Sequence, residues 1–198
     1  MKTAAAALLL TLSASPALAT TASYTIDATH SQTAFAVRHL VISTVRGEFT
    51  KTEGTVVIDD ADVTKSKVEA VISVESVSTR EVDRDKHLKS ADFLDAARFP
   101  TITFKSTRVE AAGAGALKVT GDLTLHGVTK SVVLDVTGPS AEITDPWKQV
   151  KRGIAASTKI NRRDFGVNFG AIDAATPAVG DEVTIQIDAE LTKAAPKK

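Results

Sequence analysis

The sequence predicts an all-β protein built mainly from antiparallel strands. Three observations carry the prediction: apolar and polar residues alternate along most of the chain, glycine and proline separate the alternating segments, and helical periodicity is nearly absent. Alternation with a period of two is typical of strands with one buried and one solvated face, which is the usual condition of antiparallel sheets. The pattern predicts roughly eight to ten strands.

The alternating segments follow one another with short turns between them. They are 34–40 (AFAVRHL), 67–76 (KVEAVISVES), 117–127 (LKVTGDLTLHG), 131–136 (SVVLDV) and 182–191 (EVTIQIDAEL). The step His126-Gly127 predicts a hairpin between the third and fourth segments. Gly113-Ala114-Gly115 predicts another hairpin turn, because it lacks the third glycine and the following helix of a phosphate-binding loop.

One stretch, 83–100 (DRDKHLKSADFLDAARFP), does not alternate. Just before it, Ser78 and Glu81 have the spacing of a capping box, which predicts a short helix over 79–89 with Ser78 as its N-cap. This helix and the turn after it, near residues 79–95, are too polar to form a core. We therefore expect them to lie over the β-structure.

This polar stretch has two interpretations. Asp83, Asp85 and His87 could form an acid–base cluster, but basic residues surround them. The favoured interpretation is a solvated helix face, anchored on the β-structure by Phe93 and Phe99.

The first nineteen residues, MKTAAAALLLTLSASPALA, have the features of a secretory signal peptide. Lys2 precedes an apolar run, and Ala17-Leu18-Ala19 fits the small-residue pattern of a cleavage site. The run is much shorter than the ~20 apolar residues of a membrane-spanning helix, and no later segment reaches that length. We expect removal of residues 1–19, export, and a mature chain of residues 20–198 that forms a single domain.

Charge and cysteine content exclude several function classes. Lys plus Arg equals Asp plus Glu at 24 each, and no basic cluster is interleaved with aromatic residues. A nucleic-acid partner is therefore not expected. The chain has no cysteine, which excludes disulfides, a c-type haem and a zinc site with thiolate ligands.

The histidines show no catalytic or metal-binding spacing. They are His30, His39, His87 and His126, and no two form an H-x-H or H-E-x-x-H motif. No G-x-S-x-G motif is present either, so we expect no catalytic residues and no metal site. His39 differs from the others because alternation places it on the inward face beside Phe35 and Val37. It is either a satisfied core histidine or a ligand contact.

Four motifs, in order, resemble the signatures of the YceI-like family. They are Asp27-x-x-His30-Ser31 with 35–40 (FAVRHL) and 45–49 (VRGEF), then 84–106 (RDKHLKSADFLDAARFPTITFKS), 121–136 (GDLTLHGVTKSVVLDV) and 160–167 (INRRDFGV). The resemblance covers essentially the whole mature chain. The one departure is Leu94, a position that is commonly aromatic in the family.

The resemblance implies a lipocalin-like antiparallel β-barrel of about eight strands in the bacterial periplasm. It also implies that the barrel interior binds a long isoprenoid-type lipid, either an isoprenoid quinone or a polyprenyl phosphate, with no other cofactor. Members of the family are often dimers, so a homodimer is an option. A barrel of eight strands has room for one ligand, which agrees with this expectation.

Inward alternation in such a barrel predicts the residues that contact the lipid. The expected ligand-binding residues are Phe35, Val37, His39, Phe49, Ile102, Phe104 and, from the fourth motif, Phe165. A neutral His39 in an apolar lumen could donate a hydrogen bond to the polar head of the lipid.

Three functions remain open at this point. The favoured one is binding, sequestration or transport of an isoprenoid-type lipid in the periplasm. The second is a lipid-modifying enzyme on the same scaffold, with His39 and a carboxylate as the reactive groups. The third is a stress-response interaction protein whose lipid is structural.

Overall fold

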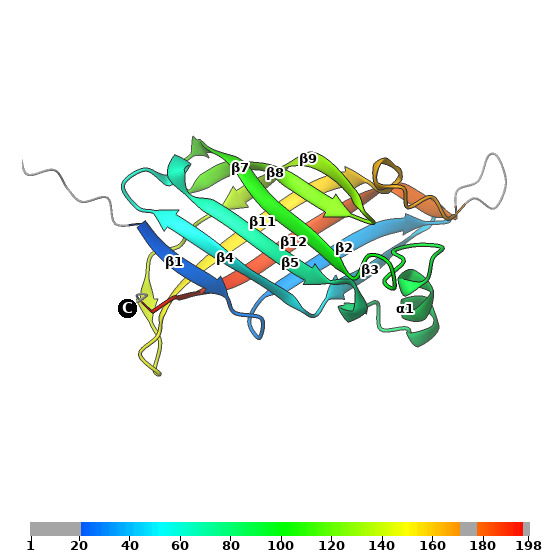
Figure 1. Ribbon diagram of the computed structural model, residues 1–198, viewed down its shortest axis with the longest axis horizontal. Helices are drawn as coiled ribbons and strands as arrows, with labels where there is room; N and C mark the ends of the chain where they lie inside the picture. The colour runs from blue at the N-terminus through cyan, green and yellow to red at the C-terminus, as the bar shows by residue number, and fades with distance from the viewer. Residues whose placement is uncertain (1–20, 171–177, 196–198) are drawn as a thin grey trace, which may run out of the picture.

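The computed structural model describes residues 21–170 and 178–195, which form a closed barrel of eight antiparallel strand positions with one short helix at one end (Figure 1). This confirms the predicted fold class. The predicted signal peptide, residues 1–19, lies outside the described residues. Within those residues, no helix is both long enough and apolar enough to cross a membrane.

The regular elements have the following bounds. The strands are β1 Thr21–Ile26, β2 Gln32–His39, β3 Ser43–Phe49, β4 Thr52–Asp59, β5 Lys67–Ser73, β6 Val77–Ser78, β7 Thr101–Gly113, β8 Ala116–Leu125, β9 Val128–Thr137, β10 Ile143–Thr144, β11 Val150–Asn161 and β12 Val179–Lys193. The helices are the 3-10 turns η1 Val63–Lys65, η2 Val74–Ser76 and η3 Arg162–Phe165, and the α-helix α1 Val82–Lys89.

The barrel closes because β12 pairs along both of its edges. One edge is hydrogen-bonded to β11, and the other to β1 at one end and to β2 at the other. Around the wall the order is β11, β9, β8, β7, β5, β4, β1 and β12. Toward the α1 end, β2 continues the wall position of β1, β3 that of β4, and β6 that of β5. Each of these three wall positions is therefore made of two strands with a bend between them.

The bend between β1 and β2 is fixed by the Asp27-x-x-His30-Ser31 motif. The Asp27 carboxylate accepts hydrogen bonds from the Lys151 ammonium (2.7 Å), from the hydroxyl and backbone N–H of Thr29, and from the ring of His30. Lys151 is itself buried and also contacts Glu190 at 2.9 Å. Asp27, His30 and Glu190 lie close enough together to hold a cation, but the Lys151 ammonium already lies between the two carboxylates.

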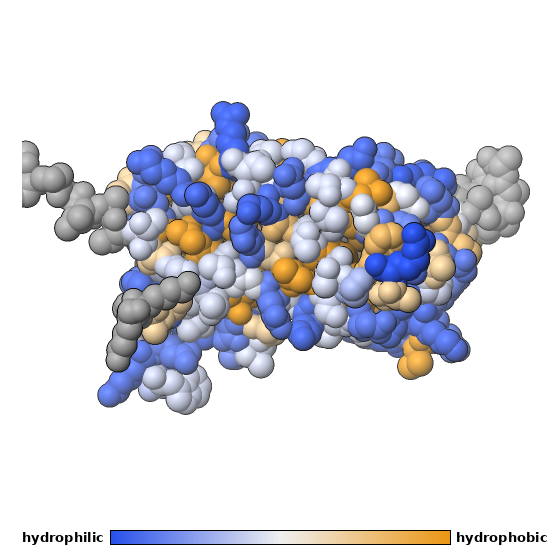
Figure 2. Space-filling model, viewed as in Figure 1, coloured by the Kyte–Doolittle hydropathy of each residue, from blue (hydrophilic) through white to orange (hydrophobic). Residues whose placement is uncertain are grey.

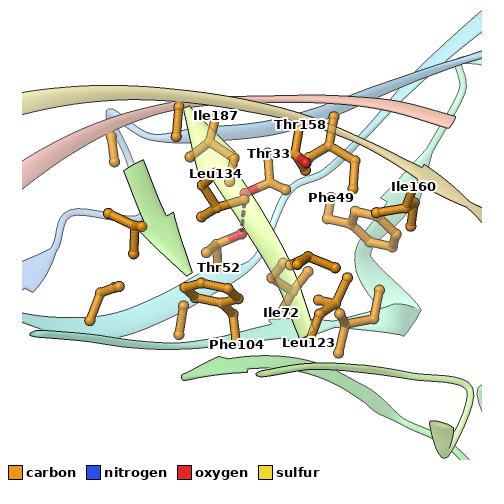
Figure 3. A pocket seen from close by; sticks show the side chains of 18 of the residues that line it. Thr33, Phe49, Thr52, Ile72, Phe104, Leu123, Leu134, Thr158, Ile160 and Ile187 are labelled. Carbon is orange, nitrogen blue, oxygen red and sulfur yellow. Dashed lines mark hydrogen bonds between the residues drawn. The ribbon is translucent and has the colours of Figure 1, made fainter. Parts of the chain in front are cut away.

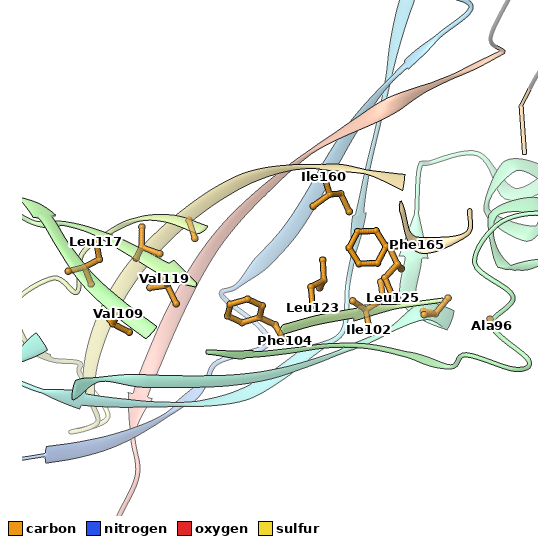
Figure 4. Close-up of a cluster of buried hydrophobic side chains, with 13 residues drawn as sticks. Ala96, Ile102, Phe104, Val109, Leu117, Val119, Leu123, Leu125, Ile160 and Phe165 are labelled. Carbon is orange, nitrogen blue, oxygen red and sulfur yellow. The ribbon is translucent and has the colours of Figure 1, made fainter. Parts of the chain in front are cut away.

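The inward side chains of the strands form the hydrophobic core. The larger cluster gathers residues from β7, β8, β9 and β11, such as Val109, Leu123 and Ile160 (Figure 4). A smaller cluster around Tyr24 and Leu191 lies at the end of the barrel away from α1. The outer surface is largely hydrophilic, with small separate hydrophobic patches, in the face that Figure 2 shows. The alternation therefore separates an apolar interior from a wet exterior, as predicted.

The two predicted hairpin turns are confirmed. Leu125 pairs with Val128 around His126-Gly127, and both turn residues have positive φ values, 51° and 75°. Gly113 pairs with Ala116 at the β7–β8 turn. Left-handed central residues match the twist of the flanking strands, which is why glycine is favoured there.

The helix begins later than the capping box predicted. α1 starts at Val82, and its N-cap is Glu81, whose carboxylate accepts hydrogen bonds from two backbone N–H groups of the first turn at 2.6 and 3.2 Å. Ser78 lies in β6 instead and does not cap the helix. The physical reason is Arg80, whose φ of 63° is left-handed and interrupts a helix.

The sequence predicted that the charged side chains of α1 are solvated, but two of them are half-buried and hydrogen-bonded to Thr79. Asp85 accepts hydrogen bonds from the backbone N–H (2.7 Å) and hydroxyl (2.5 Å) of the buried Thr79. Arg84 donates to the same hydroxyl and to the Thr79 carbonyl. These two half-buried side chains hold the helix against the end of β6. The anchoring role of Phe93 agrees with its burial beneath the helix segment.

The ion pair at the β1–β2 bend predicts a pH dependence of stability. Hydrogen bonds from Lys151, and then from Thr29, hold the pKa of the Asp27 carboxyl well below its usual range. The folded state therefore binds this proton less readily than the unfolded chain, so the stabilisation is present above about pH 4 and is lost as the pH falls. We expect Asp27→Asn to lower the free energy of unfolding by about 1–3 kcal/mol at pH 7 and to flatten its acid limb.

Urea unfolding followed by circular dichroism between pH 3 and 7 measures both effects. Asp135→Asn is the control, since it removes an exposed pair with Lys118 and should change stability by about 0–1 kcal/mol. Parallel acid limbs for Asp27→Asn and the wild type would contradict this role of the bend.

Candidate functional site: an apolar cavity inside the barrel

The inward side chains do not fill the barrel, and they leave a cavity of about 270 Å³ (Figure 3). The cavity is bordered by Phe93 and Val167 toward the α1 end and by Ile58 and Ile154 toward the opposite end. Its volume is near the lower end of the ~300–1,000 Å³ range of small-molecule sites in proteins. It is therefore large enough for a slender ligand.

The cavity wall is almost wholly apolar. Aliphatic and aromatic side chains come from every wall position, among them Phe35, Val56, Ile72, Phe104, Leu123, Leu134, Ile160 and Ile185. The polar residues in the lining are Thr33, Thr52, Ser66, Lys67, Thr158 and Arg162. Such a surface favours a ligand with an extended apolar body and few polar atoms.

Two glycines help to keep the lumen open. A Cβ added to Gly121 would lie 2.4 Å from the Phe104 ring, and one added to Gly47 would lie 2.5 Å from the Phe35 ring. Both rings therefore rest directly against the backbone of a neighbouring strand. A larger residue at either glycine would push the ring away from the wall and into the lumen.

A polar cluster lies at the end of the barrel away from α1. The Tyr24 ring is fully buried, and its hydroxyl donates to Glu142 at 2.5 Å. Lys193 also donates to Glu142 (2.7 Å), while Arg152 lies over the Tyr24 ring and donates two hydrogen bonds to Asp60. Burial, followed by the Glu142 hydrogen bond, raises the pKa of Tyr24 to about 12. The phenol is therefore neutral at physiological pH and remains a donor.

The α1 end is covered by the polar segment that does not alternate. Leu88 of α1, and Phe93 and Leu94 after it, reach the cavity lining. The rings of His87, Phe93 and Phe169 pack on one another with centroids 4.6 to 5.0 Å apart. This aromatic contact joins the helix segment to the chain that follows η3.

Arg162 lines the same end as a buried guanidinium. It donates to the carbonyls of Val167 (2.7 Å), Val179 (2.9 Å) and Gly180 (2.9 Å), and to Asp181 at 3.2 Å. Burial lowers the pKa of Arg162 from its ordinary value. Its donors join Val167, just after η3, to the first residues of β12, which is a structural use of the fourth motif.

The structure brings five of the predicted site residues to the cavity. Phe35, Val37, Phe49, Ile102 and Phe104 all line it, and the Phe35 and Phe49 rings lie 5.7 Å apart. Phe165 is only 2% exposed and packs in the larger core cluster, but it does not belong to the cavity lining. Contact of these residues with a lipid stays a prediction.

The expectation that His39 faces the lumen is wrong. The residue lies at the last position of β2, is exposed, and does not line the cavity. β3 pairs with β6 only at Glu48 and Phe49, so the outer half of the β2–β3 hairpin extends past the wall on that side. Alternation gives the face of a side chain, but burial also requires an opposite wall. His39 is therefore withdrawn as a candidate lumen donor.

The suspected acid–base cluster does not assemble in the cavity. His87 contacts Asp92 at 2.9 Å and Asp85 is bonded to Thr79. Neither Asp83, Asp85 nor His87 lines the cavity. Sequence reasoning missed Thr33 and Thr52, which line the lumen; their only signal was a threonine at an inward position of the alternation.

A family model described as YceI-like domain matches residues 24–191. The chain belongs to the YceI-like family. A UPF0312 protein of Vibrio cholerae is 40% identical over 154 residues, which cover 77% of this chain and 81% of the relative. The four motifs had pointed to the same family.

Two solved structures share this fold. Burkholderia cenocepacia BcnA superimposes with a TM-score of 0.72 at 24% identity, covering 83% of this chain and 98% of BcnA. A polyisoprenoid binding domain from Saccharophagus degradans, implicated in plant cell wall breakdown, gives 0.65 at 18% identity and covers 87% and 99% of the two chains.

The contact between Gly121 and Phe104 gives a test of how this YceI-like lumen is kept open. We expect Gly121→Ala to lower the free energy of unfolding by about 1–3 kcal/mol, because the new Cβ meets both the Phe104 ring and, at 2.6 Å, the Lys105 carbonyl oxygen. It should also reduce the binding of an apolar fluorophore, because the displaced ring enters the lumen.

Gly153→Ala is the matched control for urea unfolding and fluorophore titration. Gly153 is also within a strand, and a Cβ there would meet only the Ser140 hydroxyl at 3.9 Å. Equal effects of the two substitutions would show that the Phe104 contact has no part in shaping the cavity.

Proposed function

We propose that this protein binds a long isoprenoid-type lipid inside its barrel and sequesters or carries it in the periplasm. The observation that carries the proposal is the cavity inside the barrel, whose wall is almost wholly apolar. Covering roughly 400 Å² of apolar ligand surface at ~25 cal/mol per Å² contributes about 10 kcal/mol before the costs of association. Apolar burial alone can therefore hold the lipid, without a covalent or ionic contact.

The kind of lipid follows from the wall and from the relatives. Among the described residues, only Lys67 and Arg162 bring charge to the cavity lining. Lys67 begins β5, and the Arg162 guanidinium is occupied by carbonyl groups and Asp181. The middle of the lumen thus favours a neutral, branched hydrocarbon chain. The similarity to the Saccharophagus degradans polyisoprenoid binding domain supports the isoprenoid class.

The periplasm is supported by the predicted signal peptide and by the family. A binding function, not an enzymatic one, is supported by the cavity itself. Among the described residues, the polar side chains of its lining include no histidine or carboxylate, which are the commonest general bases.

A cavity-filling substitution tests this function. Ala156 is buried and lines the lumen from β11, whereas its neighbour Ala155 is exposed on the outer face. We expect Ala156→Leu to weaken binding of a twenty-carbon isoprenoid hydrocarbon by about tenfold or more while changing the stability of the lipid-free protein by less than about 1 kcal/mol.

Ala155→Leu adds the same side chain outside the barrel and should leave binding unchanged. Displacement of an apolar fluorophore gives the affinities, and urea unfolding gives the stabilities. If Ala156→Leu instead destabilises the lipid-free protein by about 1–3 kcal/mol with unaltered binding, the interior is an ordinary packed core and the proposal is wrong.

A further inference from the structure

We infer that Thr33 and Thr52 form a neutral polar subsite inside the lumen, which selects a lipid with an uncharged oxygen, such as an isoprenoid alcohol or quinone, over a polyprenyl phosphate. This inference rests on the proposed function and narrows its ligand class. The two hydroxyl oxygens lie 3.0 Å apart and are drawn at the cavity wall in Figure 3. Both residues are buried, at 5% and 8% exposure.

The hydrogen-bond inventory of the pair leaves one donor without a use. A threonine hydroxyl has one hydrogen to donate and two lone pairs to accept with. Within the pair, one hydroxyl donates and the other accepts, so the accepting hydroxyl keeps its own hydrogen. Neither hydroxyl makes a second hydrogen bond to any described residue. A buried donor without a partner is unfavourable, and a ligand oxygen would satisfy it.

The position of the pair places that donor inside the cavity, away from its ends. Thr33 is the first inward residue of β2, and Thr52 is the first residue of β4, so both sit where the bent strands change direction. Thr33 is paired with Phe49 and Ile187, and Thr52 with Ile72. All three of these neighbours also line the cavity. The Thr158 hydroxyl also borders the lumen, but it donates to the Val133 carbonyl at 2.8 Å. The free hydroxyl of the pair is therefore a polar donor surrounded by apolar neighbours.

This setting discriminates by charge. A carbonyl or hydroxyl oxygen can accept one hydrogen bond here at a small desolvation cost. A phosphate would carry its charge into an apolar region without a cation, because the lining cations lie at the two ends of the cavity. A polyprenyl phosphate could bind only with its head elsewhere, and would gain nothing from the pair.

Three twenty-carbon isoprenoids with the same chain provide the test: the hydrocarbon, geranylgeraniol and geranylgeranyl phosphate. Their affinities for the delipidated full-length protein are measured by displacement of an apolar fluorophore. We expect the wild type to bind the alcohol about 2- to 12-fold more tightly than the hydrocarbon, the range of one net hydrogen bond. The phosphate should bind no more tightly than the hydrocarbon.

Valine substitutions then locate the effect. In Thr33→Val or Thr52→Val alone one hydroxyl remains, so the preference for the alcohol should persist. In the double variant it should disappear while the hydrocarbon affinity is kept. Thr124→Val with Thr129→Val is the control, because this second threonine pair, with oxygens 2.8 Å apart, lies on the outer face of the β8–β9 hairpin. A purely structural role of Thr33 and Thr52 would not give this pattern.

The outcomes separate the inference from the proposed function. If none of the three lipids binds the wild type, the proposed function fails. If the hydrocarbon binds but the alcohol has no advantage, if the phosphate binds most tightly, or if the double variant keeps the preference, only the subsite is overturned.

If the double variant does not fold, the wild type alone gives a second measurement. The carbonyl stretch of the matching twenty-carbon aldehyde should shift to lower frequency when bound than in a hydrocarbon solvent, because a hydroxyl donates to it. An unshifted band overturns the subsite.

Discussion

The structure depends on one constraint, which is that β12 forms hydrogen bonds along both edges. Its pairing with β11 on one side and with β1 and β2 on the other turns an open sheet into a barrel. Closure leaves the wall without a free edge between these strands and gives the inward side chains an opposite wall, except where β2 extends past the barrel at His39. An enclosed apolar interior follows from this pairing and from the alternation of each strand.

Polar groups in the barrel are concentrated at its two ends, and this arrangement leaves the interior largely apolar. At one end Tyr24, Arg152 and Lys193 meet Glu142. At the other, Arg162 joins Val167 to Val179 at the start of β12, and Asp85 of α1 is hydrogen-bonded to Thr79. These networks satisfy the charges where the barrel ends, so the wall between them can be apolar. On that wall the Thr158 hydroxyl is bonded to the Val133 carbonyl, whereas the Thr33–Thr52 pair keeps one free donor that a ligand oxygen could accept from.

The sequence predicted those features that local patterns determine. Alternation identified the strands and placed residues such as Phe104 and Leu123 inside, and His126-Gly127 identified its hairpin because the turn needs left-handed residues. Prediction failed where the burial or the backbone conformation of a residue does not follow from its local pattern. His39 is on the inward side of β2, but no wall covers it at the strand end. Ser78 has the spacing of a capping box, but Arg80 has a left-handed backbone conformation, so the helix cannot begin at Ser78.

Long-range polar contacts could not be predicted at all. Tyr24 and Glu142 are 118 positions apart, and Thr33 and Thr52 become neighbours only when β2 and β4 bend at the same level. A threonine in an alternating strand looks the same whether its hydroxyl faces solvent or a lumen. The family motifs implied a lipid but could not choose between a charged and a neutral head, because they do not show which inward hydroxyls meet in the lumen.

The most direct test of the account is the chemical identity of the lipid that co-purifies with the protein. The full-length chain would be expressed in its native host, purified without detergent, and analysed by native mass spectrometry and by organic extraction. The account predicts one molecule per barrel of an isoprenoid lipid with an uncharged oxygen-bearing head. Recovery of the protein without lipid, or with a polyprenyl phosphate or a mixture of phospholipids, would contradict it.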